Sequence, residues 1–146
     1  MSSEFGKTIK VTVFGESHSA GIGAVVSGIP AGIEIDMDRV AAFMALRAPG
    51  KNKLSTARKE ADLPEVLSGM LDGVTTGSPI CAVIRNTDTR SGDYKNIMDI
   101  PRPGHSDFAA YMRYGGKNDV RGGGHFSGRI TAALVAAAGL VIPALE

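Results

Sequence analysis

The sequence has no charge excess of either sign and no cysteine pair, and each absence excludes a class of protein. Sixteen Lys and Arg residues face fifteen Asp and Glu residues, which leaves a formal net charge of +1. This balance argues against non-specific nucleic-acid binding as the main task. The single cysteine, Cys81, cannot form an internal disulfide, which fits a reducing compartment, and its apolar setting PICAVI is typical of a core thiol.

Long apolar runs and metal-ligand spacings are also absent. The longest apolar run, Ala132 to Ile142, is shorter than the roughly 20 residues that a membrane-spanning helix needs. The N-terminus MSSEFGKTIKVTVFGE has no basic region followed by an apolar stretch, unlike a secretory signal. Three histidines and one cysteine show none of the usual zinc spacings. We therefore expect a cytoplasmic protein with no membrane segment, no metal and no nucleic-acid partner.

The composition that remains is that of a folded soluble domain. With 146 residues, 43% of them hydrophobic and 21% charged, the chain predicts a single domain over residues 1–146. Alternating apolar residues predict strands at 8–15 and 22–28, and the stretch 63–86 predicts two strands joined at Asp72-Gly73. A helix is expected from Met37 to Arg47, with Asp36 or Asp38 as its cap.

The second half of the chain predicts two more helices around a glycine-rich loop. Ser106 is expected to cap a helix that ends near Tyr114. After Gly122–Gly124, a final helix over residues 130–142 contains one polar residue, Thr131. A helix that is apolar all round is normally buried on all sides. This one therefore predicts a partner for its outer face, either another subunit or further chain.

Two loop histidines are candidates for chemistry. In GESHSAG, Ser17 and His18 are adjacent, and adjacent side chains on extended backbone point apart, so a hydrolytic Ser–His pair is not expected. The alternative is a turn with a solvent-facing histidine. In RPGHSDF, His105 precedes a helix start, where backbone N–H groups favour an anion and an imidazole can donate a proton at neutral pH. The alternative is a residue that serves only helix entry.

The stretch RGGGHFSGRI has the features of an anion-binding loop. Its glycines allow a ligand to approach the backbone, Ser127 is a candidate helix cap, and Arg121 and Arg129 add positive charge. A plain turn before a core helix is the alternative. Further arginines lie at or beside loops: Arg47, Arg58, Arg90 and Arg102. Because arginine binds phosphate and carboxylate in a bidentate way, this set suits a small polyanionic substrate.

Five stretches together resemble one known family. FGESHSAGIGAVVSGIPAGI, LSGMLDGVTTGSPI, NTDTRSGDY, RPGHSDF and RGGGHFSGRITA are similar, in order and spacing, to the motifs of chorismate synthases. The resemblance implies an α+β fold, a β-α-β sandwich of antiparallel sheets with helices between them, of which this chain would form about half, its N-terminal portion. It implies elimination of phosphate from 5-enolpyruvylshikimate 3-phosphate to give chorismate, with reduced FMN as cofactor, NADPH as reductant and assembly as a homotetramer.

The resemblance also implies roles for individual residues. His18 matches the histidine that protonates reduced flavin, and His105 matches the one that assists the leaving phosphate. The substrate-binding positions are Ser17, Arg47, Lys53, Arg102 and Arg129. The flavin-contacting segment is His125, Phe126 and Ser127, and Arg47 is also associated with the reduced nicotinamide cofactor.

Several positions depart from the family pattern. The family usually has Arg-Ser where this chain has His125 and Phe126, and Glu where it has Ile130. Ala48 and Lys53 replace arginines, and Lys keeps the charge but loses the bidentate fork. Two hypotheses therefore stay open: part of a chorismate synthase, or a truncated, non-catalytic remnant that binds anions or partner chains. The common register of five motifs argues against an unrelated phosphate-binding module.

Overall fold

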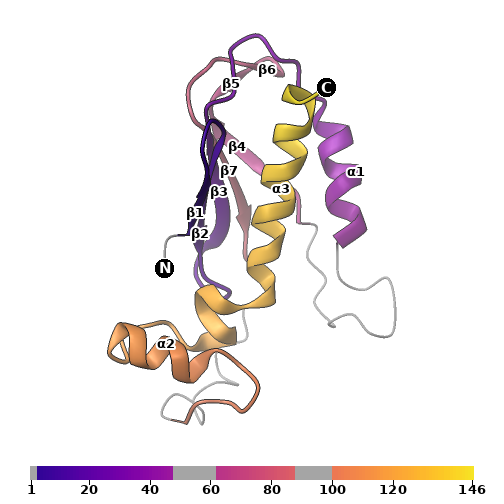
Figure 1. The fold of residues 1–146 in the computed structure, drawn as a ribbon. Coiled ribbons are helices and arrows are strands. Elements are labelled where there is room, and N and C mark those ends of the chain that lie inside the picture. Colours follow the sequence, from indigo (N-terminus) through magenta and orange to yellow (C-terminus); the bar gives the residue numbers. More distant parts are fainter. Residues whose placement is uncertain (1–2, 48–61, 88–99) are drawn as a thin grey trace.

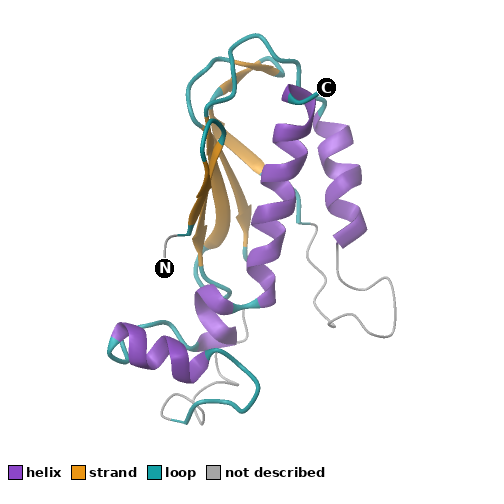
Figure 2. Ribbon diagram, in the orientation of Figure 1, coloured by secondary structure: helices purple, strands orange, loops and turns teal. Residues whose placement is uncertain are grey.

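The computed structural model describes residues 3–47, 62–87 and 100–146. Within them an antiparallel sheet carries two long helices on one face, and a third helix lies beyond one end of the sheet (Figures 1 and 2). Five strands form the sheet in the order β1-β2-β3-β7-β4: β1 Glu4–Gly6, β2 Lys10–Gly15, β3 Gly21–Ser27, β4 Glu65–Ser68 and β7 Ile80–Arg85. A two-stranded hairpin consists of β5 Met70–Leu71 and β6 Val74–Thr75. The α-helices are α1 Met37–Arg47, α2 Asp107–Tyr114 and α3 Thr131–Val141. Short 3-10 segments are η2 Arg121–Phe126, η3 Gly128–Ile130 and η4 Ile142–Ala144. The expected α+β class is therefore confirmed.

Period-two alternation places one apolar face of the sheet toward α3. Val11 and Val13 of β2 are buried and pair with Val26 and Ala24 of β3. Ile22 of β3 is likewise buried and pairs with β7. Because successive side chains of a strand point to opposite faces, these residues share one surface. That surface and α3 together form the core.

Helix α3 lies between the sheet and α1 (Figure 1). Its buried alanines let the backbone approach the strands closely, and Gly139 faces α1, where an added Cβ would lie 3.2 Å from Val40 Cγ1. Leu134, however, is 39% exposed, and Ala138 is exposed beside it. Within this chain the helix is thus covered on two sides, and the partner expected for its third side stays a prediction.

The expected strands at 8–15 and 22–28 and the expected helix at 37–47 are confirmed as β2, β3 and α1. Asp36 is the cap of α1, because its Oδ1 accepts hydrogen bonds from the backbone N–H groups of Asp38 at 2.9 Å and Arg39 at 3.3 Å. Strand β1 had no distinguishing sequence pattern and was not predicted.

The prediction of two strands within 63–86 is wrong, because four form there. Gly69, at φ +84°, separates β4 from β5, and a Cβ at this position would lie 2.6 Å from Ile80 Cα. This close crossing over β7 breaks the chain into shorter strands. Asp72 and Gly73, both at positive φ, form the tight turn between β5 and β6, as the sequence indicates.

Helix α2 has the expected bounds, but its expected cap is wrong. Ser106 is at the N-cap position without a side-chain capping hydrogen bond. The carboxylate of Asp107 turns instead toward Arg102 and His105. Gly115 ends the helix in the left-handed conformation, at φ +58°. Lys53, Ala48, Arg58 and Arg90 lie outside the described residues.

Candidate functional site

Three loops meet at the end of the sheet where α3 begins (Figure 1). They are the β2–β3 loop, the segment that precedes α2 and the glycine-rich segment that precedes α3. The triglycine segment Gly122–Gly124 has positive φ at all three residues, +57°, +85° and +54°. A Cβ at Gly122 would lie 2.3 Å from His18 Cε1, and one at Gly123 would lie 2.7 Å from His105 Cε1. Since only glycine leaves that space, the segment lies in close contact with both histidines that the sequence singled out.

The β2–β3 loop brings Ser17 and His18 together inside the protein. Ser17 is 2% and His18 7% exposed, so the alternative of a solvent-facing histidine is wrong. His18 Nδ1 lies 3.2 Å from Ser17 Oγ, although the two side chains were expected to point apart. The extended-backbone argument does not hold because both residues lie in a turn. The backbone N–H of Ser17 donates to Gly124 O at 3.1 Å, which ties this loop to the glycines.

Asp107 orients the second histidine. Its Oδ1 is 2.6 Å from His105 Nδ1, and its Oδ2 accepts from Arg102 Nε at 2.7 Å. The Arg102 guanidinium, hydrogen-bonded to this carboxyl, holds the pKa of Asp107 well below its usual range. An ionised carboxylate has no proton to donate, so the proton of this contact belongs to His105 Nδ1. His105 Nε2 is then the atom that faces Gly123 and is placed to exchange a proton.

Two of the expected substrate-binding arginines meet on a buried carboxylate. Arg47 Nη1 donates to Asp62 Oδ2 at 2.7 Å, and Arg129 Nη1 donates to Asp62 Oδ1. Asp62 was not among the predicted site residues, because the charged stretch around it, RKEAD, offers no periodicity or motif that distinguishes it. It could have been found only from its contacts.

Asn86 connects two parts of the site. One is the arginine centre, formed by Asp62, Arg47 and Arg129, and the other is the histidine loop, the β2–β3 loop that carries His18. Its Oδ1 accepts from Arg129 Nε at 3.2 Å. Its Nδ2 donates to the carbonyl oxygens of Glu16 and Ser19, each at 2.9 Å. This side chain, also missed from the sequence, fixes the β2–β3 loop against the start of α3.

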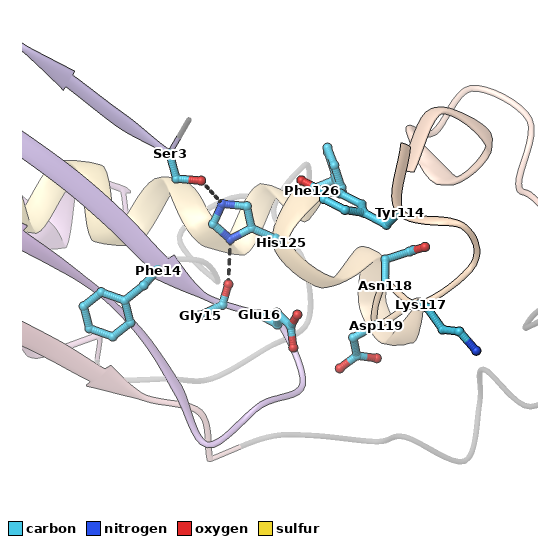
Figure 3. A pocket seen from close by; sticks show the side chains of 10 residues that line it. All are labelled: Ser3, Phe14, Gly15, Glu16, Tyr114, Lys117, Asn118, Asp119, His125 and Phe126. Carbon is cyan, nitrogen blue, oxygen red and sulfur yellow. Dashed lines mark hydrogen bonds between the residues drawn. The ribbon is translucent and has the colours of Figure 1, made fainter. Parts of the chain in front are cut away.

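A pocket of about 470 Å³ opens beside the histidine loop (Figure 3). Its lining residues are Ser3, Phe14, Gly15, Glu16, Tyr114, Lys117, Asn118, Asp119, His125 and Phe126. His125 Nδ1 donates to Gly15 O at 2.7 Å, and its Nε2 lies 2.8 Å from Ser3 Oγ. The rings of Phe126 and Tyr114 are 6.2 Å apart. The pocket therefore combines aromatic walls with polar groups, as small-molecule sites do.

The remaining residues of the glycine-loop region, Ser127 and Arg121, make contacts within the chain. Ser127 Oγ accepts from the backbone N–H of Arg129 at 3.3 Å, which confirms its expected capping role, while it is not among the residues that line the pocket. Arg121 pairs with Asp119 at 2.7 Å, and this hydrogen bond lowers the pKa of the Asp119 carboxyl.

The predicted site residues thus fall into three groups. Ser17, His18, Arg102 and His105 surround the triglycine segment, Arg47 and Arg129 share Asp62, and His125 and Phe126 line the pocket. Across residues 3–47, 62–87 and 100–146, no group of three potential metal ligands gathers. Over the same ranges, no helix has the length and apolar character to cross a bilayer.

Comparisons with known proteins agree on one family. A family model described as chorismate synthase matches residues 9–146. The chain is 51% identical over 133 residues to a chorismate synthase of Helicobacter hepaticus, covering 91% of this chain and 37% of the relative. It is 47% identical over 144 residues to one of Roseobacter denitrificans, covering 99% of this chain and 39% of the relative.

A solved structure supports the same assignment at the level of the fold. A crystal structure of a chorismate synthase matches with a TM-score of 0.67 and 28% identity, over 95% of this chain and 34% of that chain. The chain therefore spans somewhat more than a third of the length of the curated relatives that it matches.

Proposed function

This chain belongs to the chorismate synthase family, and we propose that it forms the N-terminal portion of an enzyme of the shikimate pathway. The proposed reaction is the 1,4-elimination of phosphate from 5-enolpyruvylshikimate 3-phosphate to give chorismate. The observation that carries the proposal is the pair of histidines, His18 and His105, which lie against two adjacent glycines of the triglycine segment.

The arginines of this end of the chain's fold suit the proposed substrate, which carries a phosphate and carboxylates. The side chains of Arg102 and Arg47 are 30% and 23% exposed, so neither is closed off from solvent, and arginine binds both kinds of anion in a bidentate way. Arg129 is buried and supports Arg47 through their common partner, Asp62. Ser17 and Lys53 complete the proposed set of substrate contacts, and Lys53 lies outside the described residues.

His105 is the proposed proton donor to the leaving phosphate. In the elimination, the C–O bond breaks, phosphate takes its electron pair, and a ring proton is lost as a new C=C bond forms. Negative charge accumulates on the departing oxygen, and a proton held at His105 Nε2 would stabilise it. Asp107 supports this role because it engages the opposite ring nitrogen at 2.6 Å.

The pocket beside the histidine loop fits a flavin in part. Tyr114 and Phe126 offer aromatic surface for a planar ring, Lys117 offers a cation, and His125 lines the same space (Figure 3). Reduced FMN, when bound, supplies a reversible source of electrons, which suits a reaction without net redox change. His18, on the loop that contributes Gly15 and Glu16 to the pocket, is the proposed residue that holds a proton beside the flavin.

The proposal extends to the reductant and the assembly. NADPH is the proposed source of reducing equivalents, with Arg47 as its contact. The proposed homotetramer is supported by apolar surface that this chain leaves open, including Leu134 on α3 and Phe108 on α2.

A turnover assay tests the proposal. The full gene product is mixed with 5-enolpyruvylshikimate 3-phosphate and chemically reduced FMN, and chorismate formation is followed by absorbance while phosphate is measured separately. Replacing His105 by Ala is expected to lower kcat about 10²- to 10⁴-fold, the usual contribution of a general acid. Ser106→Ala is the matched control, because Ser106 makes no capping hydrogen bond. Unchanged kcat in His105→Ala would remove this histidine from the mechanism.

A non-catalytic anion-binding remnant is the second candidate function. It is favoured by His125, whose two ring nitrogens already contact Gly15 O and Ser3 Oγ within the chain. In that case the purified protein would bind phosphate without turnover, and reduced FMN would show no spectral change on mixing.

A further inference from the structure

Asp62 is a buried carboxylate that each of two arginines approaches from a different element. Arg47 is the last residue of α1, and Arg129 lies in η3, immediately before α3. Each carboxylate oxygen accepts from one guanidinium, Oδ2 from Arg47 and Oδ1 from Arg129. The Asp62 side chain is 1% exposed. It is therefore out of reach of a dissolved ligand, and its side-chain contacts among the described residues are with the two arginines.

Further hydrogen bonds fix the orientation of both guanidinium groups. Arg47 Nε donates to Thr131 Oγ1 at 3.1 Å, and its Nη2 donates to Gly128 O at 3.3 Å. Arg129 is held through Asn86. The side chains of Asp62, Arg47 and Arg129 together carry one net positive charge. Within this trio, Asp62 thus orients both guanidinium groups while its single negative charge offsets only one of their two positive charges.

We propose that Asp62 is a positioning residue for anion binding, which sets the geometry in which Arg47 presents its guanidinium to the substrate. The inference rests on the proposed function, because the substrate contact of Arg47 belongs to it. A preoriented guanidinium loses little side-chain freedom when an anion binds, so loss of Asp62 weakens binding even though Asp62 touches no ligand.

A purely structural role is the competing interpretation. The same ion pairs tie the C-terminus of α1 to the start of α3. If that were their whole contribution, removing the carboxylate would lower stability and leave anion affinity unchanged in the molecules that fold.

The variant Asp62→Asn separates the two roles. Asp62 has φ +49°, a conformation that Asn tolerates better than other side chains, so the backbone is retained. The amide oxygen can accept from one arginine, but the amide N–H₂ then faces the other. We expect KM for the substrate to rise about tenfold or more while kcat stays within about threefold, as for a loss of ground-state binding.

A second readout does not depend on turnover. The ¹⁵N–¹H signals of the arginine Nε groups are followed in the full gene product while inorganic phosphate is added. In Asp62→Asn, we expect the Kd for phosphate to rise about tenfold and the Arg47 signal to broaden. Asp36→Ala is the control: it removes the cap of α1 at the end opposite Arg47, so it should lower the Tm and leave both KM and the phosphate Kd unchanged.

The outcomes distinguish this inference from the proposed function. Weaker phosphate binding in Asp62→Asn, in a protein without turnover, supports the positioning role and contradicts the proposed function. Normal KM and phosphate Kd in Asp62→Asn, in a protein that makes chorismate, overturn the positioning role alone. Asp62→Gly, which also suits positive φ, is the second variant. Failure of both variants to fold would assign Asp62 to folding and would likewise overturn the inference.

Discussion

Two carboxylates in this protein are each shared by two basic side chains, and they differ in burial and in sequence distance. Asp62 binds Arg47 and Arg129, which are 15 and 67 residues away. Asp107 binds Arg102 and His105, which are five and two residues away. The Asp62 side chain is 1% exposed, and that of Asp107 is 11% exposed.

The difference matters for chemistry as well as for stability. Both partners of Asp62 are arginines, whose guanidinium groups are hydrogen-bond donors that do not transfer protons. One partner of Asp107 is a histidine, the side-chain type that most often transfers protons in enzymes. The buried centre is therefore suited to holding an anion, and the more exposed centre is suited to moving a proton.

Breaking the buried centre should have the largest effect on stability. Arg129→Ala leaves the Asp62 carboxylate buried with one partner fewer, and we expect it to lower the free energy of unfolding by about 3 kcal/mol. Arg102→Ala removes one partner of the more exposed carboxylate, Asp107, and should lower the free energy of unfolding by about 1 kcal/mol. Urea unfolding of both variants measures the difference. Equal losses would show that burial does not separate the two centres.

Substitution in the glycine segment that contacts His18 and His105 should give the next largest effect on stability. A Cβ at Gly124, at φ +54°, would lie 2.0 Å from the carbonyl oxygen of Asp119. We expect Gly124→Ala to lower the free energy of unfolding by about 2–3 kcal/mol, from backbone strain and a clash with main-chain atoms. Gly128→Ala is the matched control, because nothing lies within 4 Å of its added Cβ. A comparable loss in the control would contradict the steric argument.

The pH dependence of stability sharpens the comparison further. The folded-state pKa of Asp107 is depressed by Arg102, so this carboxyl stabilises the fold above its unfolded pKa of about 4. The stabilisation is lost as the pH falls below that value toward the folded pKa. Asp107→Asn should remove on the order of 1 kcal/mol of this dependence. Urea midpoints between pH 5 and pH 2.5 measure it, and a variant with the same pH profile as the parent would refute the assignment.

Removing an exposed ion pair should have the smallest effect on the free energy of unfolding. Arg85 Nη2 lies 3.1 Å from Glu65 Oε2, and the two side chains are 59% and 54% exposed. Glu65→Gln should change the free energy of unfolding by less than about 0.5 kcal/mol, because water and salt screen the pair. Thermal unfolding at low and high salt is the measurement. A loss as large as that of Arg102→Ala would show that exposure is not the controlling variable.

The difference between contacts local in sequence and contacts between distant residues also explains which parts of the fold and site were predictable. Strands β2 and β3 and helices α1 and α2 follow from local apolar periodicity and turn residues, and they were predicted within about two residues. The four short strands between residues 65 and 85 were not, because Gly69 breaks the chain through a contact with β7 rather than through a local signal. Both histidines were named from motifs, whereas the burial of His18 against Ser17 was not foreseen.

The sequence by itself determined the family, the α+β class and the list of basic and histidine residues, because each of these follows from order, spacing or periodicity along the chain. Only the tertiary structure decided which charges meet. Asp62 lies between Arg47 and Arg129 because α3 packs between α1 and the sheet. Three successive glycines at positive φ leave the space in which His18 and His105 both lie against one loop. Such contacts join residues far apart in the chain, and no local preference of the backbone specifies them.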